Sequence, residues 1–435
     1  MHYGLRHNFF WILVNRAGTL LAGLLAAALL NRALGASGRG FLAEMQTWIG
    51  LFSVLLGISL DTAIYHYANR ERYPIGDGVR FGTTLVLSLV AGVAASAGMA
   101  MFIWLRPEQV SEQADAHAAL MGILLILSMM ASNVMVFAQA AGLSKASAFG
   151  GLSNGLVYLL LIGHFFLADR IDLGIALGAA SAAQGTAFAV TAALCFRSIE
   201  GPIEFDFGAA KGMLFAGLKQ HVATISTFVY TKINQLIVYK YAGASEAGLY
   251  AAALNLAFAT QIVFGSFQSA LYTRVANAGD DYDITIRSLR LIFYGGLLFV
   301  GVAMLFAGPI MMLYGGADFT HSVNLFRVLV LAFWLLSLSS LVSPLYVKAG
   351  AFWFASWSAV VLGSISIAFN FVFVPQFKAS GAAAATVVTT ASGFAMCLGF
   401  LYYLSKKSPL TIFKPDFSAD LFLLRSPLQK ILEKK

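Results

Sequence analysis

Long apolar stretches recur along the whole of this 435-residue chain. A helix needs about 20 mostly apolar residues to cross the hydrocarbon core of a bilayer. Stretches of about that length lie at 9–30, 41–64, 81–105, 118–140, 148–168, 174–196, 219–241, 248–272, 290–313, 323–345, 353–374 and 381–404. We therefore predict an all-α polytopic membrane protein with about twelve transmembrane helices. An even number of crossings places both ends of the chain on one side of the membrane.

A short sequence motif between the first two stretches returns 208 residues later. Gly35-Ala36-Ser37-x-x-Gly40-x-x-Ala43 reappears as Gly243-Ala244-Ser245-x-x-Gly248-x-x-Ala251. At the same offset Arg32 corresponds to Lys240 and Ala68-Asn69 to Ala276-Asn277, and Gly174 corresponds to Gly381 at an offset of 207. Duplicated halves are common in secondary transporters, which move one half against the other around a site between them.

The repeat predicts two equivalent six-helix lobes related by an axis along the membrane normal, because equivalent spans point the same way. The predicted divisions are an N-terminal lobe at 1–200, a cytoplasmic linker at 201–218, a C-terminal lobe at 219–404 and a basic amphipathic cytoplasmic tail at 405–435.

Composition supports a membrane protein. Hydrophobic residues make up 59% of the chain and charged residues 11%, and the mean hydropathy is +0.78. A soluble domain has about a quarter of its residues charged. The net charge of +8 at this hydropathy indicates a basic membrane face and not a nucleic-acid partner.

Basic residues are unevenly distributed between alternate loops. If the N-terminus is cytoplasmic, the outer segments hold only Arg32, Arg39, Arg106, Arg170, Lys240 and Lys378. The remaining excess of Lys and Arg then marks the cytoplasmic face, as the positive-inside rule requires. This predicts a multi-pass protein with both termini in the cytoplasm.

Several kinds of chemistry have no sequence support. The chain contains no G-x-x-x-x-G-K-[ST] phosphate loop and no H-E-x-x-H motif, and its seven histidines and two cysteines are scattered. The predicted loops are short, with the longest at 197–218. We therefore expect no catalytic residues, no metal and no cofactor, and a substrate pathway inside the helix bundle.

Two cations lie within predicted spans, where a charge costs roughly 2.5–3.5 kcal/mol on insertion scales. Arg16 in the first span lies beside Asn15, and Lys232 in the seventh span lies beside Asn234 and Gln235. These spans are equivalents in the two lobes, so we predict that each lobe offers one cation to a shared cavity for an anionic group. The structural alternatives are an Arg16 that reaches the headgroups and a Lys232 that is a buried structural cation.

Other polar residues allow two interpretations each. Gln261 and Gln268 share one helix face and either line the cavity or, as we favour, form interhelical hydrogen bonds. Glu44 and Asp61, at the two ends of the second span, are either candidates for coupling transport to an ion or hydrated helix ends.

Three segments resemble polysaccharide exporters. Residues 31–41, Asn-Arg-Ala-Leu-Gly-Ala-Ser-Gly-Arg-Gly-Phe, are similar to the family's A-R-x-L-G-x-x-x-x-G opening. Lys232-Ile233-Asn234-Gln235-Leu236-Ile237-Val238, continued by Gly248-Leu249-Tyr250, resembles its R-I-D-Q-L-I-L…V-G-L-Y segment. Leu313-Tyr314-Gly315-Gly316-Ala317-Asp318-Phe319 is similar to its L-L-Y-G-x-x-F turn. The matches occur in the expected order along the whole chain, so the chain is identified as resembling the Wzx-type flippases and, more broadly, the superfamily of multidrug extruders and lipid II flippases.

The resemblance implies a function in the bacterial cytoplasmic (inner) membrane. Such a protein flips an undecaprenyl-pyrophosphate-linked oligosaccharide, an O-antigen or exopolysaccharide repeat unit, from the inner to the outer leaflet by alternating access. The expected partners are this lipid-linked substrate, membrane lipid, a polysaccharide polymerase and a chain-length regulator.

One departure limits what the resemblance carries over. Many relatives have an acidic residue where this chain has Asn234, so a proton-coupling role at that position does not transfer. The alternative function is a multidrug or small-solute ion-coupled antiporter on the same fold, and a non-transport scaffold is a third. The predicted cationic cavity favours the flippase, because cationic drugs prefer carboxylates.

Overall fold

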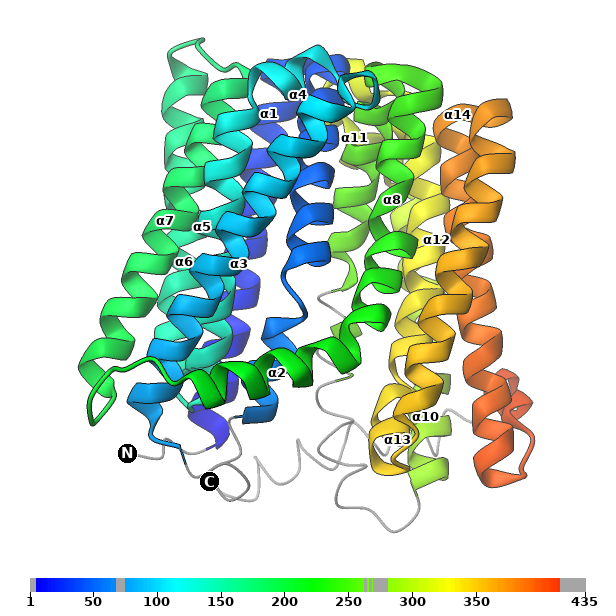
Figure 1. Cartoon of the computed structure of the whole chain (residues 1–435). Coiled ribbons are helices and arrows are strands. Elements are labelled where there is room, and N and C mark those ends of the chain that lie inside the picture. The colour runs from blue at the N-terminus through cyan, green and yellow to red at the C-terminus, as the bar shows by residue number, and fades with distance from the viewer. Residues whose placement is uncertain (1–4, 68–74, 262–263, 266–267, 269–280, 415–435) are drawn as a thin grey trace, which may run out of the picture.

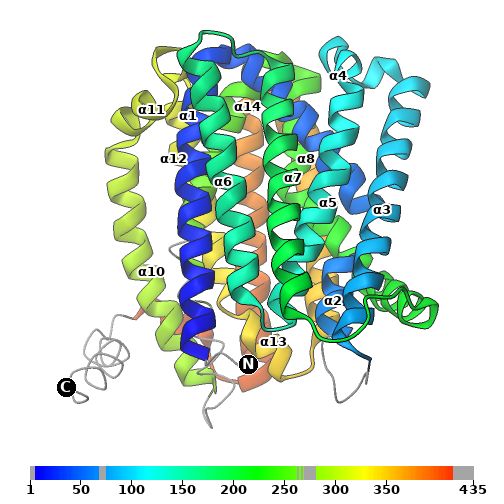
Figure 2. The same ribbon diagram turned by 90° about the vertical axis from the view of Figure 1, so that its left-hand side faces the viewer.

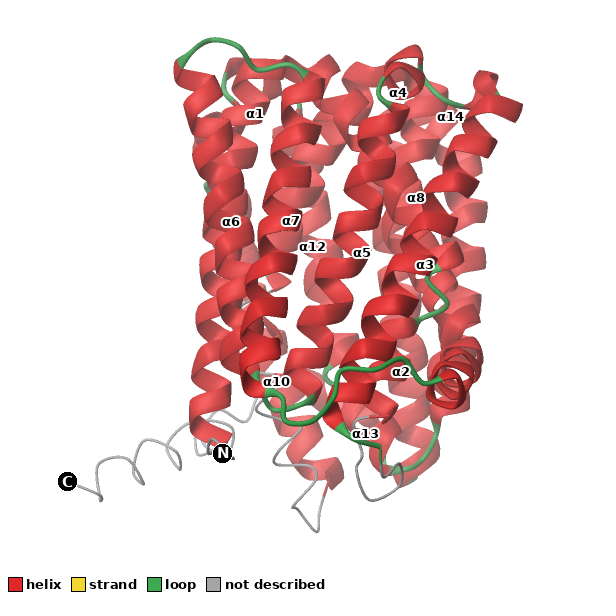
Figure 3. Cartoon of the chain, turned by 60° about the vertical axis from the view of Figure 1, so that its left-hand side comes forward, coloured by secondary structure: helices red, strands yellow, loops and turns green. Residues whose placement is uncertain are grey.

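The computed structural model describes residues 5–67, 75–261, 264–265, 268 and 281–414, and this part of the chain is built of helices without strands (Figure 3). The longer helices are α1 (Leu5–Leu56), α3 (Asp77–Leu105), α5 (Ala118–Ala140), α6 (Ser144–Leu167), α7 (Leu173–Ser198), α8 (Phe207–Ala259), α10 (Asp281–Leu305), α12 (Ser322–Ser340) and α14 (Phe352–Ser405). Shorter elements are α2 (Leu60–Tyr67), η1 (Pro107–Gln109), α4 (Glu112–Ala116), α11 (Ala307–Gly315), η2 (Ala317–Phe319), α13 (Ser343–Lys348) and η3 (Pro409–Phe413).

Three helices of more than 50 residues each contain a single residue with non-helical backbone. The break lies at Gly35 in α1 (φ 64°), at Gly243 in α8 (φ 85°) and at Lys378 in α14 (φ 52°). Glycine adopts positive φ without steric cost, so the first two breaks fall where the sequence permits them. Gly35 and Gly243 are the first residues of the two copies of the repeated motif, and their backbones break in the same way.

Each broken helix crosses the bundle twice. Counting both segments of α1, α8 and α14 together with α3, α5, α6, α7, α10 and α12 gives twelve crossings among the described residues. In the described part of the chain, eight helices are long and apolar enough to cross a membrane, and large apolar side chains such as Val90, Leu160 and Leu298 are exposed on their surfaces. The first turn of α1 and η3 lie at the same end of the bundle (Figure 1). The predicted all-α, twelve-helix membrane fold is confirmed.

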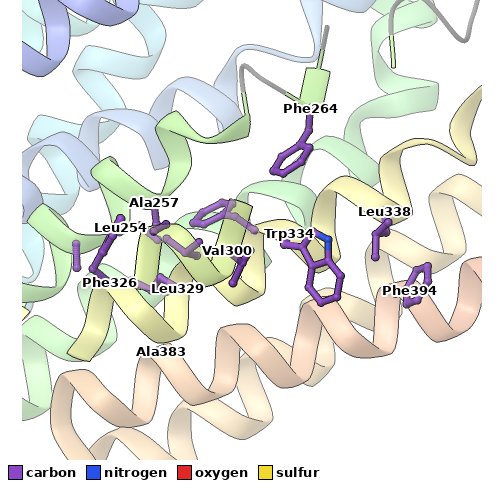
Figure 4. Close-up of a cluster of buried hydrophobic side chains, with 14 of the residues drawn as sticks. Leu254, Ala257, Phe264, Val300, Phe326, Leu329, Trp334, Leu338, Ala383 and Phe394 are labelled. Atoms are coloured by element: carbon purple, nitrogen blue, oxygen red, sulfur yellow. The ribbon is translucent and has the colours of Figure 1, made fainter. Parts of the chain in front are cut away.

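The two halves have separate hydrophobic cores. The largest buried cluster lies within residues 237–412, and Figure 4 shows Leu254, Val300 and Trp334 among its side chains. Two further clusters lie within residues 26–179 and 60–213. Most apolar side chains of each half are therefore buried within that half, and a few residues of the first half, such as Leu24 and Ala28, pack against the core of the second.

Two boundaries differ from the sequence prediction. The second span was expected to run to residue 64, but the helix ends at Leu56 and α2 begins at Leu60, with Ile58 and Ser59 at positive φ between them. Residues 201–218 were expected to be a linker, whereas α8 already begins at Phe207. Its first turns lie across the end of the bundle beside α2 and α3 (Figures 1 and 2), and Met213 belongs to a core cluster of the first half.

The halves meet closely at the end of the bundle where both glycine breaks lie, which we call the closed end. A Cβ atom on Gly40 would collide with the carbonyl group of Ala244, and one on Gly248 would collide with that of Ala36. The two contacts are reciprocal, because each residue of one pair lies 208 positions from its counterpart in the other. Only glycine lets the two backbones approach this closely.

Some predictions concern residues outside the described part of the chain. These are the repeat positions Ala68-Asn69 and Ala276-Asn277 and the amphipathic tail from residue 415 onward.

Candidate functional site

A cavity of about 600 Å³, the central cavity, lies between the two halves. Its wall comes mainly from α1, α5 and α6 of the first half, and Asn255 on α8 and Tyr314 on α11 complete it from the second. The lining on α1 extends from Asn15 to Ala27, which is about 18 Å of helix. Among the described lining residues Arg16 is the only charged side chain, and none is a carboxylate. The cavity therefore suits a ligand with an anionic group.

The helices around Arg16 pack through small residues. The Thr19 hydroxyl donates to the Asn15 Oδ1 (3.1 Å) and to the carbonyl oxygen of Gly151 on α6 (3.0 Å). A Cβ on Gly151 would collide with the Asn15 amide, so glycine at this position lets α6 approach α1. This contact fixes the first segment of α1, while the Arg16 side chain remains exposed to the cavity.

Lys232 lies on the face of α8 that meets α1. On this face Phe228 packs against Gly50, and Gln235 accepts a hydrogen bond from Thr47 Oγ1 (3.3 Å). Tyr239 packs against Phe41, with 6.0 Å between the ring centroids. Lys232 itself is half-buried, with its Nζ 5.5 Å from the centre of the Phe258 ring. It is not among the described lining residues of the central cavity, so the structure does not join it directly to Arg16.

Arg39 is a buried cation that the sequence interpretation placed in an outer loop. The second segment of α1 begins before the predicted span, so Arg39 lies within the helix and is only 3% exposed. Its Nε has no hydrogen-bond partner among the described residues. One signal could have revealed it: Arg39, Ala43 and Thr47 follow at helical spacing, which places the arginine on a packed face.

A sequence comparison identifies the family of this chain. The profile of the family described as "Polysaccharide biosynthesis protein" matches residues 5–277, well over half of the chain. The chain belongs to this family. No protein of curated function matches it in sequence.

Solved structures of several transporters have the same fold. An inward-facing multidrug resistance MATE family transporter of the MOP superfamily superposes with a TM-score of 0.73 at 14% identity, over 90% of this chain and 96% of that chain. An outward-facing MATE family transporter gives 0.63 at 14% identity, over 92% and 95%. The lipid II flippase MurJ in an inward closed conformation gives 0.65 at 14% identity, over 91% and 87%. At this identity the likeness concerns the fold alone.

This member of the polysaccharide biosynthesis family also buries a carboxylate at the closed end. Glu44 is 1% exposed, and its Oε1 accepts hydrogen bonds from the Ser111 backbone (3.0 Å) and from Trp48 Nε1 (3.3 Å). Its Oε2 has no hydrogen-bond partner. Glu44 lines a second cavity of about 430 Å³ between the halves, together with Tyr239 and Lys240. Of the two coupling candidates, this one is enclosed by protein.

Asp61 has a different environment. It lies in the first turn of α2, after the break that ends α1, and its side chain is exposed. Tyr65, one turn further, is within electrostatic range of both Asp61 and Arg16, and its hydroxyl donates to Gln139 Oε1 of the central cavity (2.8 Å). Asp61 is therefore near the cavity end that carries Arg16, without being among its described lining residues.

Gln261 and Gln268 bind a neighbouring helix. Gln261 Nε2 donates to the Phe333 carbonyl (2.6 Å) and to Ser337 Oγ (3.0 Å), and Gln268 Nε2 donates to the Ser340 carbonyl (3.0 Å) and to Ser343 Oγ (2.9 Å). Neither is among the described lining residues of the central cavity. These contacts match the interhelical alternative of the sequence prediction.

Asn234 lies at the centre of a buried network of neutral side chains in the second half. Its Nδ2 donates to Tyr250 OH (3.3 Å) and Thr386 Oγ1 (3.0 Å). Its Oδ1 accepts from Ser366 Oγ (3.3 Å) and Asn370 Nδ2 (3.2 Å). All five residues are buried. A neutral amide serves as both donor and acceptor here, which an ionised carboxylate cannot do.

We expect Asn234→Ala to lower the free energy of unfolding by about 1–3 kcal/mol per group left unsatisfied, since several buried donors and acceptors lose their partner. The measurement is thermal unfolding of the purified protein in detergent. Ser364→Ala is the matched control, because the exposed Ser364 hydroxyl bonds only the Val360 carbonyl of its own helix. An Asn234→Ala protein as stable as the control would show that this network contributes little.

Proposed function

We propose that this protein flips an undecaprenyl-pyrophosphate-linked oligosaccharide, such as an O-antigen or exopolysaccharide repeat unit, from the inner to the outer leaflet. The observation that carries the proposal is the central cavity between the halves, which has a cation and, among its described lining residues, no carboxylate. The family match to polysaccharide biosynthesis and the fold shared with a lipid II flippase support the same substrate class.

The structure suits one stage of an alternating-access cycle. The halves are in contact at the closed end, through Gly40 and Gly248, while Arg16 is exposed at the other end of the cavity. The TM-score is higher against the inward-facing transporter than against the outward-facing one, so we assign the closed end to the periplasmic side. We propose that both termini are cytoplasmic and that the protein resides in the bacterial cytoplasmic (inner) membrane, and the distribution of basic loops supports this orientation.

In the proposed cycle the lipid tail stays in the membrane while the head group enters the cavity. Arg16 and Asn15 bind the pyrophosphate from the cytoplasmic end, and the polar side chains of Gln139, Asn154 and Asn255 offer hydrogen bonds to sugars. Lys232, with Gln235 beside it, presents a cation nearer the closed end. The opening of that end then releases the head group to the outer leaflet, where a polysaccharide polymerase and a chain-length regulator are the proposed partners.

A multidrug or small-solute antiporter on the same fold is the alternative. Cationic drugs need a carboxylate or an equivalent negative site, and Glu44 lies outside the described lining of the central cavity. The lining therefore favours an anionic substrate.

Reconstitution in liposomes tests the proposal. The wild-type protein should move a fluorescent lipid-linked oligosaccharide between leaflets, and Arg16→Gln should slow this by about tenfold, because a charge-assisted contact is worth about 1.5–3 kcal/mol. Arg106→Gln is the control, since Arg106 is exposed and its Nη1 lies 3.7 Å from Glu108 Oε1. Wild-type liposomes that flip no lipid-linked oligosaccharide but exchange a cationic drug for ions would establish the antiporter instead.

A further inference from the structure

The second cavity, of about 430 Å³, lies between the two halves beside the closed end. Its wall comes from α1 and the η1 turn of the first half and from α8 and α14 of the second. On α8 the lining extends from Ile233 to Tyr241, about 12 Å of helix, and it stops just before the break at Gly243. A ligand in this cavity would therefore touch both halves.

The cavity has an apolar edge on the lateral surface of the bundle. Ile367 and Phe371 on α14 line it and are 39% and 52% exposed, in a helix long and apolar enough to cross a membrane. The exposed Tyr241 ring packs edge-on against Phe371, with 6.2 Å between the ring centroids. Exposed apolar side chains on a membrane-spanning helix contact lipid tails, so an acyl chain of the bilayer can reach the cavity at this edge.

The inner wall carries a buried carboxylate with an unused oxygen. Glu44 is 1% exposed, and its Oε1 already accepts the hydrogen bonds from Ser111 and Trp48. Its Oε2 has no hydrogen-bond partner, and among the described residues no cation forms an ion pair with Glu44. A buried carboxylate oxygen without a donor costs free energy, so a ligand that brings a positive charge and an N–H donor would be favoured here.

The other charged residues that line the cavity lie at its exposed edge and have partners. Glu108 Oε1 lies 3.7 Å from Arg106 Nη1, and Lys240 Nζ donates to Gln109 Oε1 (3.1 Å). All four side chains are exposed, so water solvates their charges. Among the described lining residues, the buried charge that a ligand would meet is therefore that of Glu44.

A primary ammonium group fits this environment better than a metal ion or a sugar. Its N–H groups can donate to the Glu44 carboxylate, and the rings of Trp48 and Tyr239, which also line the cavity, attract an organic cation. A hard metal ion needs about six oxygen ligands, and no group of three His, Cys, Asp or Glu side chains that could hold one occurs among the described residues. A sugar needs several hydrogen-bonding partners, whereas Ile233 and Leu236 contribute apolar wall. That wall suits the chains of a lipid that bears the ammonium group.

We propose that the second cavity binds a phospholipid with a primary ammonium head group, of the phosphatidylethanolamine type, and that the bound lipid stabilises contact between the two halves at the closed end. The ammonium group donates to the Glu44 carboxylate, the phosphate lies toward the exposed edge, and an acyl chain passes Ile367 and Phe371 into the bilayer. That this lipid comes from the outer leaflet rests on the proposed function; the site itself does not.

Lipid binding to the delipidated full-length protein in detergent tests the site by native mass spectrometry. The probes are phosphatidylethanolamine, phosphatidylcholine and phosphatidylglycerol with the same acyl chains, and soluble phosphoethanolamine. We expect phosphatidylethanolamine to bind about tenfold more tightly than the other two lipids, because the trimethylammonium group of choline has no N–H donor and glycerol has no positive charge. Equal binding of the three lipids would contradict the proposal. Phosphoethanolamine that binds as tightly as the lipid would do so too, because it would identify a soluble amine as the ligand.

Two variants locate the binding in this cavity. Glu44→Gln should weaken phosphatidylethanolamine binding by about tenfold and leave phosphatidylcholine binding unchanged, since the amide oxygen can still accept from Ser111 and Trp48 but the negative charge is lost. Ile367→Trp, which leaves Glu44 in place, should also weaken it, because the larger ring occupies the apolar edge. Glu108→Gln is the matched control, as it removes an exposed carboxylate of the same cavity.

Thermal unfolding separates a lipid site from a structural carboxylate. A ligand that binds the folded protein raises its melting temperature, so phosphatidylethanolamine should raise that of the wild type and have much less effect on Glu44→Gln. A melting temperature of Glu44→Gln that is lower by the same amount with and without the lipid, together with unchanged lipid affinity, would overturn the proposal. It would show that Glu44 only supports the fold.

Spin labels at Ser37→Cys and Ser245→Cys report the closure directly. Both serines are exposed next to the glycine breaks, and the native Cys195 and Cys397 are buried. In liposomes, replacement of phosphatidylcholine by phosphatidylethanolamine should shift the label distances toward short values in the otherwise wild-type protein and leave them unchanged when Glu44→Gln is added. Identical shifts in both proteins would sink the proposed stabilisation, because they would reflect a general property of the bilayer.

These measurements need no lipid-linked oligosaccharide, so the two proposals can fail separately. Phosphatidylethanolamine binding that depends on Glu44 in a protein that flips no lipid-linked oligosaccharide would leave the site and remove the proposed function. Normal flipping by a protein that binds phosphatidylethanolamine and phosphatidylcholine equally would do the reverse.

Discussion

Replacement of Lys232 by alanine should lower the amount of surface polysaccharide by about a hundredfold while the protein still reaches the membrane. Lys232 is half-buried on the α8 face that meets α1, with its Nζ 5.5 Å from the centre of the Phe258 ring. If Lys232 binds the anionic head group when the halves enclose it, truncation of its side chain costs about 2–5 kcal/mol of binding to that intermediate. Lys232→Arg keeps the charge and should retain part of the activity.

The measurement is surface polysaccharide in cells that depend on this protein, with membrane levels of each variant determined in parallel. Lys240→Ala is the control on the same helix, because Lys240 is exposed and donates to Gln109 Oε1 (3.1 Å). Asp61→Asn should also retain more activity than Lys232→Ala, since Asp61 is exposed on α2 and is not among the described lining residues of the cavity. Full activity of Lys232→Ala at normal membrane levels would contradict the proposed role of the cation. So would a result in which Asp61→Asn loses all activity while Lys232→Ala remains active.

The repeated glycine motif made the main features of the fold predictable. Gly35 and Gly243 mark where two long helices turn back, and both are non-helical in the structure. The apolar stretches along the sequence then predicted the number of crossings, because the thickness of the bilayer sets how many apolar residues each transmembrane helix needs. The break in α14 at Lys378 had no such signal, since a positive φ at lysine depends on the surrounding packing and not on a local preference.

The candidate site was only partly predictable. Arg16 could be recognised because a charge early in an apolar stretch stands out, and it lines the central cavity. Arg39 was missed because its helix begins at the glycine break, six residues before the predicted apolar span, and only the helical spacing of Arg39, Ala43 and Thr47 indicated that it lies on a packed face. The start of α8 at Phe207 was missed for a similar reason: its first turns lie against α2 and α3 and do not cross the membrane, so they lack the length and apolarity of a span.

Gly40→Ala should prevent the closed end from forming and should abolish transport. A methyl group at this position would occupy the space of the Ala244 carbonyl, and the obstacle is backbone, which cannot move away as a flexible side chain would. Overpacking of a close contact typically costs about 1–3 kcal/mol, and here the cost applies only to the state in which the halves meet. Gly248→Ala should have the same effect, because its methyl group would meet the Ala36 carbonyl.

Spin labels at Ser37→Cys and Ser245→Cys should therefore show a shift of both alanine variants toward longer distances, with the helices of each half intact by circular dichroism. Gly163→Ala on α6 is the matched control, because nothing lies within 4 Å of a Cβ at that position. If Gly40→Ala transports at the wild-type rate and keeps the short label distance, then the glycine pair does not control closure, and the halves must separate along another surface. If only the label distance changes, closure at this end is not required for transport. We expect Gly40→Ala to lose both transport and the short label distance. Alternating access requires that the outer end can close before the inner end admits the next substrate.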